Sequence, residues 1–355
     1  MNSIKEISSS FGLYVKLRLD ALQDWAHVLE RVSYFPVMYR NRSVEFQMAY
    51  QRWHGGEWHD NSLVIYWDSK PVAVWPLSYM SKDGDFKITS QGLPVLPPLY
   101  VNSFSRISCK RINKICFDIL ESLAINLGVS SWESEESFNS SKGFSDWHME
   151  AMARKSTCLV RHDLFIDLSM NLGLIKQNFR KSYKSLITSG MKKWSVKVLN
   201  VPDELTWNEF KDLHYYVAGR KTRSDETWDI HLRDIEDQEG FLIYLQDDIG
   251  KMVGGGFFNF TKDEGFYAVA AYDRNHFDHP LGHLIQYRAI QELKDRGVSW
   301  YKIGQRPYQS EVLELSEKEI SIGDFKQGFC SHVFPRFILK HPVSNHHYNL
   351  VAGSD

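Results

Sequence analysis

Basic side chains gather in one stretch of the chain that contains no acidic residue. Between Asp167 and Asp203 there are seven lysines and arginines and no aspartate or glutamate. A helix is expected from the cap residue Asn171 to about residue 189, with Gly190 as its stop. In such a helix the cations at 176, 180 and 184 share one face. That face can bind phosphate groups, and a solvated helix face is the alternative. The candidate phosphate-binding residues are Arg180, Lys181 and Lys184, within the set Lys176, Arg180, Lys181, Lys184, Lys192, Lys193 and Lys197.

A second basic segment, residues 219–224, follows an expected helix. It contains Arg220 and Arg223, two guanidinium groups close enough in sequence to bind one carboxylate or phosphate. The alternative interpretation is a basic helix end that the helix dipole favours.

Residues 272–283 link an expected strand to an expected helix, and Tyr272 and His283 are further candidates for substrate binding there. Backbone N–H groups at such a helix start can bind phosphate. Three histidines fall in this segment without a cysteine or carboxylate at metal-ligand spacing, so no metal site is predicted.

The composition is that of a folded protein large enough for two domains. The chain has 355 residues, 43% of them hydrophobic, and a formal net charge of −2. This charge provides no bulk attraction to nucleic acid or membrane, and no DNA partner is expected. No run of about 18 apolar residues is present, so no membrane span is expected. Four scattered cysteines are expected to be reduced, which favours the cytoplasm, with the inner face of the membrane as a further location.

The elements that must position these residues occur as a weak internal repeat. In the first half, strands are expected at 63–67 and 72–77, then a polar turn and a third strand, a helix at about 107–126 and a strand from 129. In the second half, strands are expected at 241–245, 252–260 and 267–272, a helix at about 281–295 and a strand at 298–303. Both helices end at a glycine, Gly128 and Gly297, as left-handed caps require.

Strands and helices in the middle of the chain complete the second copy. A short strand is expected at 164–168, a strand at 194–199 and a helix from Pro202 to about residue 217. This element order resembles that of an acyltransferase domain of the GNAT type. The predicted fold class is therefore α/β, with mixed sheets in two GNAT-like domains in tandem, residues 1–155 and 156–355. The histidine-rich end from His341 is interpreted as a tail.

Three short motifs occur in order along the second half of the chain. They are residues 179–184 (FRKSYK) followed by Gly190, residues 297–304 (GVSWYKIG), and residues 322–329 (IGDFKQGF). Together they resemble the motifs of the FemABX family of transferases. The first resembles the basic helix that opens the second half of these proteins, the second their G-x-x-x-Y-D-x-G strand, with Lys302 where the family often has Asp, and the third their F-K-x-G-F signature.

The resemblance implies a transferase that moves an aminoacyl or acyl group onto an amine of a phosphorylated envelope precursor. The precursor would be a sugar or muropeptide of peptidoglycan or a surface glycan. The donor would be aminoacyl-tRNA or acyl-CoA, with no tightly bound cofactor, and tRNA is a candidate partner. Lys326 would stabilise the negative charge that develops on oxygen when an amine attacks a carbonyl. Asp273 and Asp324 would accept a proton, and Gln305, Arg306 and Tyr308 would bind substrate beyond the last core strand.

Two alternatives remain open at this stage. The same fold could use acyl-CoA to acylate the nitrogen of an amino sugar. A degenerate copy of the fold could instead bind a glycan precursor or a partner protein without catalysis. The oligomeric state is not predicted.

Overall fold

A computed structural model describes residues 3–137, 143–311 and 315–343. By its internal packing the chain forms two compact units. Unit 1 comprises residues up to Tyr34, Tyr39–Val160 and the described residues from Pro335 onward, and unit 2 comprises Phe35–Met38 and Arg161–Phe334. A single cut between residues 155 and 156 does not describe these units, because the last described strand belongs mainly to unit 1. None of the helices in the described ranges is long and apolar enough to cross a membrane.

Unit 1 is built on a four-stranded sheet and a long helix. The sheet has the order β1-β3-β4-β7, and a separate three-stranded sheet has the order β2-β5-β6. A parallel bridge joins Val95 to Ser134 of β8. The elements are α1 (Ile4–Ser10), β1 (Val15–Leu17), η1 (Arg18–Asp20), α2 (Leu22–Glu30), α3 (Asn41–His54), β2 (Glu57–Asp60), β3 (Leu63–Trp67), β4 (Lys70–Trp75), β5 (Ser78–Lys82), β6 (Asp85–Thr89), β7 (Leu99–Tyr100), α4 (Arg106–Leu127), β8 (Ser131–Ser137) and α5 (Asp146–Ala153). The short η2 (Val37–Tyr39) lies between α2 and α3 in sequence, and its first two residues belong to unit 2.

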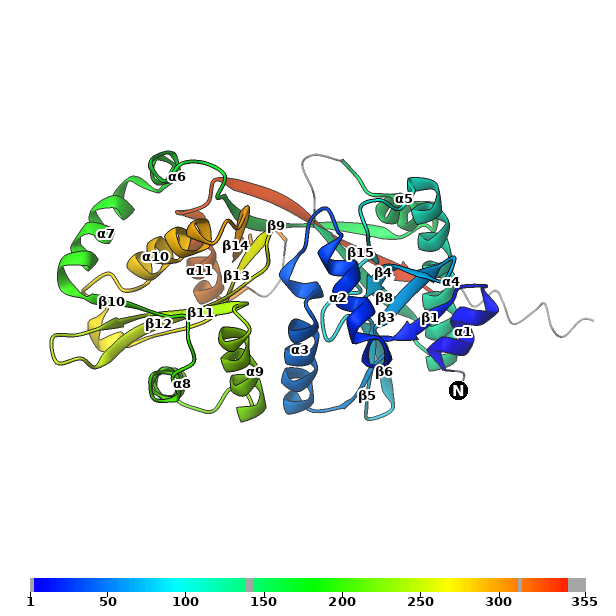
Figure 1. The fold of residues 1–355 in the computed structure, drawn as a ribbon, viewed down its shortest axis with the longest axis horizontal. Helices are drawn as coiled ribbons and strands as arrows, with labels where there is room; N and C mark the ends of the chain where they lie inside the picture. The colour runs from blue at the N-terminus through cyan, green and yellow to red at the C-terminus, as the bar shows by residue number, and fades with distance from the viewer. Residues whose placement is uncertain (1–2, 138–142, 312–314, 344–355) are drawn as a thin grey trace, which may run out of the picture. The chain divides into compact units, whose positions relative to one another are not determined.

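Unit 2 has a six-strand run in the order β10-β11-β12-β13-β14-β9. Helices α7 and α10 cover one face of this sheet, and α8 and α9 cover the other (Figure 1). The elements are β9 (Thr157–Asp167), α6 (Leu172–Asn178), α7 (Lys181–Lys193), β10 (Ser195–Leu199), α8 (Glu204–Ala218), α9 (Asp225–Glu236), β11 (Gly240–Gln246), β12 (Met252–Phe260), β13 (Glu264–Tyr272), η3 (Arg274–His276), α10 (Gly282–Asp295), β14 (Trp300–Gln305) and α11 (Glu317–Gln327). The last strand, β15 (His332–Pro342), begins in unit 2 and lies mainly in unit 1.

The two units repeat the same series of elements. β3, β4, β7, α4 and β8 of unit 1 correspond in order to β11, β12, β13, α10 and β14 of unit 2. In each series the strand after the long helix pairs in parallel with the segment that precedes the helix. Gly128 and Gly297 both have positive φ, as the predicted left-handed caps require. The predicted tandem repeat is therefore present.

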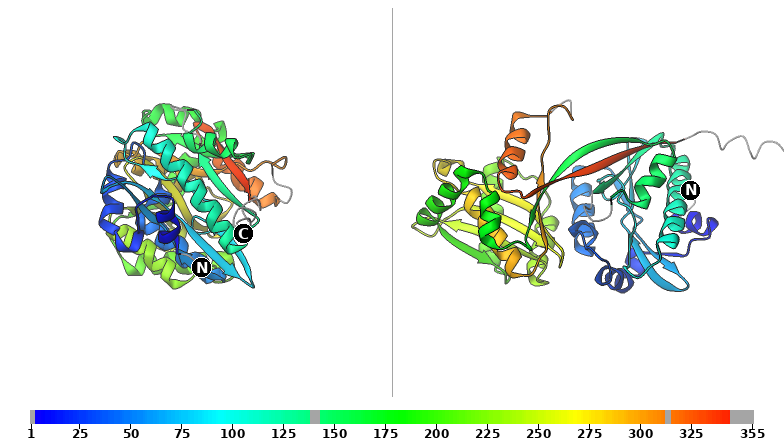
Figure 2. Two further views of the ribbon diagram at one scale, coloured as in Figure 1. Left: turned by 90° about the vertical axis from the view of Figure 1, so that its right-hand side faces the viewer. Right: turned by 90° about the horizontal axis from the view of Figure 1, so that it is seen from above.

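Unit 1 receives its last strand from the far end of the sequence, whereas unit 2 receives it from the start of its own segment. β8 in unit 1 pairs antiparallel with β15, and β14 in unit 2 pairs antiparallel with β9. Figure 2 shows β9 (green) and β15 (red) as long strands, of 11 residues each. His341 lies in β15 and is only 4% exposed, between Ser134 and Ser156, so its assignment to a tail was wrong. His346 and His347 lie outside the described residues.

Two local predictions differ from the structure. The polar turn at residues 82–86 joins β5 to β6 in the separate small sheet, and the third strand beside β4 is the short β7. Prolines at 94, 97 and 98 limit the pairing of the segment before β7, because proline has no N–H to donate.

The single basic helix expected from Asn171 is two helices, α6 and α7. They are separated at Phe179, whose backbone is extended and whose side chain is buried in the core. Gly190 lies inside α7, where its missing side chain lets α7 approach the Pro280 carbonyl before α10. The cations at 176, 180 and 184 therefore do not share one helix face.

Candidate active site

Strands β13 and β14 part at one end of the unit 2 sheet. They pair in parallel only from Glu264 to Phe266 on β13 and from Trp300 to Lys302 on β14. β13 continues to Tyr272 and β14 to Gln305 without further pairing to each other. The end of the sheet where the two strands separate is where several of the predicted residues meet.

Lys326 projects from α11 toward this separation. Its Nζ lies 5.4 Å from the centroid of the Tyr267 ring on β13. A methyl group on Gly304 of β14 would lie 2.5 Å from the same nitrogen. Within the described ranges, the Lys326 ammonium has no hydrogen bond and no ion pair. Burial of the half-buried ammonium lowers its pKa, because the charged form is desolvated without a carboxylate to compensate.

Two tyrosine hydroxyls meet on β13, and one of them belongs to the Tyr267 ring that Lys326 faces. The hydroxyls of Tyr267 and Tyr272 are 2.7 Å apart. Burial raises the pKa of Tyr267 to about 12 and that of Tyr272 well above its ordinary value, so both phenols are neutral near pH 7. The site thus offers a cation and two neutral hydroxyls.

Packing of the 325–329 segment explains the motif in which Lys326 lies. The Phe325 ring would lie 3.1 Å from a methyl group on Gly282 at the start of α10. A methyl on Gly328 would lie 2.3 Å from the Tyr183 ring, and Phe329 is fully buried. These contacts anchor the end of α11 on both sides of Lys326, so the ammonium is held by its neighbours rather than by a flexible turn.

A group of charges lies on the outer side of α11. Arg180 Nη1 lies 3.0 Å from Asp324 Oδ2, and Arg306 Nη2 lies 3.7 Å from Asp324 Oδ1. The hydrogen bond from Arg180 lowers the pKa of Asp324. Arg306 also stacks on Tyr308, with its Cζ 4.8 Å from the ring centroid. The carboxylate that was predicted to be a proton acceptor is therefore held between two guanidinium groups.

The other predicted residues near α10 have local partners. Asp273 is 4% exposed and accepts a hydrogen bond from the backbone N–H of Asn275, so it caps the turn that follows β13. His283 packs edge-on against the Tyr183 ring at 4.5 Å, and burial lowers its pKa to about 4. It is neutral near pH 7.

Arg220 and Arg223 do not join this group. They lie in the connection between α8 and α9, which pack on the opposite face of the sheet from α7 and α10. Arg223 stacks on Trp228 with its Cζ 4.9 Å from the ring centroid. Burial and the charge of Arg223 lower the pKa of His214 to about 4. Arg180 pairs with Asp324 of α11, the helix that also carries Lys326, whereas Arg220 follows α8 on the other face of the sheet.

Lys181 and Lys184 are exposed on the outer face of α7, together with Lys192. Gln305 is exposed at the end of β14, next to Gly304. Among the described residues, no group of three or more His, Cys, Asp or Glu side chains could hold a metal ion.

Tyr267 and Gly304 were not predicted from the sequence. In a regular strand Tyr267 and Tyr272 would face opposite sides, because they are five residues apart. The register of β12 and β13 shifts between Phe257 and Phe258, which pair with Val269 and Tyr267 and leave Ala268 as the extra residue. This bulge turns Tyr267 to the side of Tyr272.

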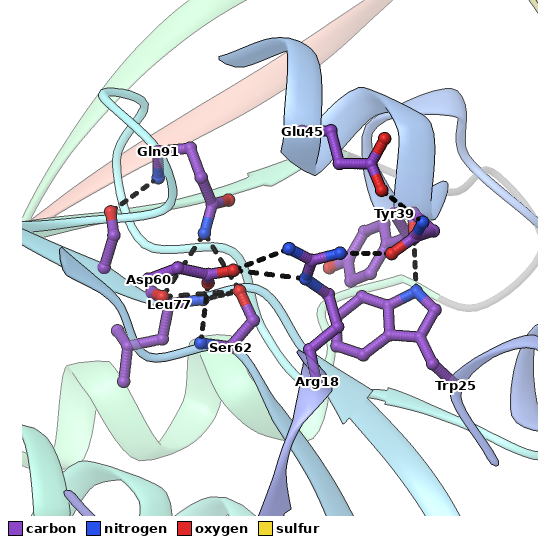
Figure 3. Close-up of polar contacts among 10 residues, drawn as sticks. Arg18, Trp25, Tyr39, Glu45, Asp60, Ser62, Leu77 and Gln91 are labelled. Carbon is purple, nitrogen blue, oxygen red and sulfur yellow. Dashed lines mark hydrogen bonds and ion pairs between the residues drawn. The ribbon is translucent and has the colours of Figure 1, made fainter. Parts of the chain in front are cut away.

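Unit 1 contains a buried polar network whose charges are compensated internally (Figure 3). Arg18 is 3% exposed, and its Nη2 donates to Asp60 Oδ2 at 2.7 Å. Arg18 also donates to Asn41, which donates to Glu45 at 2.8 Å. The Arg18 guanidinium differs in this from the Lys326 ammonium, for which the described part of the chain provides no acidic partner.

Comparisons with known proteins find a likeness at the level of the fold. No family model matches the sequence, and no curated protein matches it. The solved structure of FemX superposes with a TM-score of 0.68 at 11% identity, covering 93% of this chain and 98% of that one. The fold is FemX-like. L-PGS from Bacillus licheniformis superposes with a TM-score of 0.56 at 12% identity, covering 92% of this chain and 93% of that one. The predicted FemABX-like, GNAT-like tandem is confirmed as a fold.

Proposed function

We propose that this protein is a transferase that forms an amide bond by moving an aminoacyl group onto an amine of a phosphorylated cell-envelope precursor. Lys326 is the observation that carries this proposal. Its ammonium is half-buried against the ring of Tyr267, a neutral phenol, and it forms no ion pair within the described ranges. A cation placed in this way stabilises the negative charge that develops on a carbonyl oxygen under attack by an amine. The likeness to FemX and L-PGS supports an envelope substrate.

The start of α10 favours an aminoacyl-RNA donor over acyl-CoA. A pyrophosphate would need free N–H groups in the loop between β13 and α10. The Phe325 and Tyr272 rings lie against Gly282 at the start of α10, within 3.5 Å of where a methyl group would be. Loop N–H groups bond to carbonyls inside the loop at three positions, His276, Phe277 and His279. The packed rings leave little space at the start of α10, and the internal bonds leave few loop N–H groups to bind the pyrophosphate of a coenzyme.

The phosphate of the acceptor would bind near Arg180. The Arg180 side chain is 42% exposed although it pairs with Asp324, so its charge remains accessible. Lys181 and Lys184 extend the positive surface along α7, where no acidic residue occurs. Exposed cations of this kind bind phosphate mainly through charge.

The test is amide formation by the full chain with tRNA charged with radiolabelled amino acids and a UDP-linked muropeptide. We expect transfer by the wild type and a loss of at least about 100-fold in Lys326→Met. Lys318→Met is the matched control, because Lys318 is exposed on the same helix, and it should keep full activity. Equal rates for Lys326→Met and wild type would overturn the role of Lys326.

Two other outcomes would replace the proposal. Release of free thiol from acetyl-CoA in the presence of an amino sugar, without use of charged tRNA, would establish the acyl-CoA alternative. Binding of the precursor without turnover of either donor would establish the non-catalytic alternative.

A further inference from the structure

We propose that the hydroxyl groups of Tyr267 and Tyr272 form a proton relay that carries the reacting proton from the attacking nitrogen to the leaving atom. This inference rests on the proposed function and names how that site would move protons. It uses two residues of β13, of which only Tyr272 was expected to bind substrate.

Packing holds the two rings in place. A methyl group on Gly254 would lie 3.1 Å from the Tyr272 ring, and one on Gly282 would lie 3.5 Å from its hydroxyl. Tyr272 is therefore wedged between β12 and the start of α10 at two positions that lack side chains. The Tyr267 ring stacks on Phe258, with centroids 5.2 Å apart and planes 20° apart. Fixed rings keep the 2.7 Å contact between the hydroxyls and spare the reaction the cost of ordering them.

The position of the pair relative to Lys326 suits proton transfer. Lys326 Nζ lies 5.4 Å from the centroid of the Tyr267 ring, so a carbonyl oxygen bound to the ammonium would lie against the residue that carries one hydroxyl of the pair. The carboxylates predicted to be bases are engaged elsewhere, Asp273 in its turn and Asp324 with two arginines. A neutral phenol donates one proton and accepts another, which neither an ammonium nor an ionised carboxylate can do.

The step balances without another reactant. The neutral amine of the acceptor attacks the carbonyl carbon, so a C–N bond forms and the bond from carbon to the leaving oxygen breaks. The nitrogen gives its surplus proton to one hydroxyl oxygen. A proton passes along the contact between the two hydroxyls, and the other hydroxyl gives a proton to the leaving oxygen. Both phenols end the step neutral, and the protein gains and loses no proton.

The test compares Tyr267→Phe, Tyr272→Phe and the double variant in the transfer reaction described above. We expect each single variant to lose about 100-fold in kcat with KM changed less than threefold. A relay needs both hydroxyls, so the double variant should be no slower than the slower single variant. The solvent deuterium isotope effect on kcat should fall in all three. Phenylalanine keeps each ring, and the melting temperature checks the fold.

Tyr287→Phe is the matched control, because Tyr287 is a buried tyrosine of α10 that packs on Phe179, and it should keep its kcat. Retention of kcat in either single variant, or losses that add in the double variant, would overturn the relay and leave the proposed function intact. Absence of transfer by the wild type would overturn both.

Discussion

Gly304 on β14 is in contact with the Lys326 side chain, which extends from α11 toward the point where β13 and β14 separate. A methyl group on Gly304 would lie 2.5 Å from Lys326 Nζ. Gly304 also has a φ of +149°, a backbone conformation that residues other than glycine rarely adopt. We expect Gly304→Ala to displace the ammonium and to lower kcat/KM for transfer by at least about tenfold.

Gly297→Ala is the control for this change. Gly297 also has positive φ, +76°, but a methyl group there would meet no atom within 4 Å. The Gly297→Ala substitution should lower the free energy of unfolding by about 1 kcal/mol through backbone strain alone and leave kcat/KM unchanged. Steady-state kinetics and thermal unfolding of the two variants separate displacement of Lys326 from backbone strain. Similar losses of kcat/KM in both variants would show that strain is the cause.

Lys302 forms a buried ion pair with Asp163, with 2.7 Å between Nζ and Oδ2. The Asp163 side chain is 1% exposed, so removal of the cation leaves a desolvated negative charge. We expect Lys302→Met to lower the free energy of unfolding by about 3 kcal/mol. The double variant Lys302→Met/Asp163→Leu should regain most of this loss in urea denaturation. A double variant as unstable as the single one would assign the loss to packing instead.

Asp324 makes the free energy of unfolding of unit 2 dependent on pH in the acidic range. The bond from Arg180 lowers the pKa of Asp324 below its unfolded value, so the pair stabilises the fold at neutral pH. This stabilisation is lost as the pH falls through the folded pKa. Because both side chains are more than 40% exposed, the effect should be below about 1 kcal/mol. The difference in stability between wild type and Asp324→Asn should shrink from pH 6 to pH 2, and a constant difference would contradict the ion pair.

Glu136 gives the stability of unit 1 the opposite dependence on pH. Burial raises its pKa from 4.5 to about 7, and its Oε2 lies 3.5 Å from Nδ1 of His148. The unfolded chain releases this proton at lower pH than the folded chain does, so stability should fall as the pH rises from about 4.5 to 7. Glu136→Gln cannot ionise, and it should gain up to about 3 kcal/mol relative to wild type at pH 8. Urea denaturation at pH 4.5 and pH 8 measures this, and an equal difference at both pH values would contradict it.

The sequence by itself determined the order of the elements and the tandem repeat. Apolar runs separated by a polar turn marked β11 and β12, and Gly128 and Gly297 marked the ends of α4 and α10. The motif around Lys326 was also readable, although α11 was not predicted as a helix. These features depend on residues close in the chain, because hydrogen bonding and local burial set periodicity and caps.

Only the tertiary structure decided which residues meet. Arg180 reaches Asp324 across 144 positions of sequence, and the bulge at Ala268 turns Tyr267 toward Tyr272. The same packing places Arg220 on the other face of the sheet. It also buries the side chain of His341, a residue of β15. Such contacts follow from how whole layers pack and where strand register shifts, and both depend on the combined fit of many distant side chains.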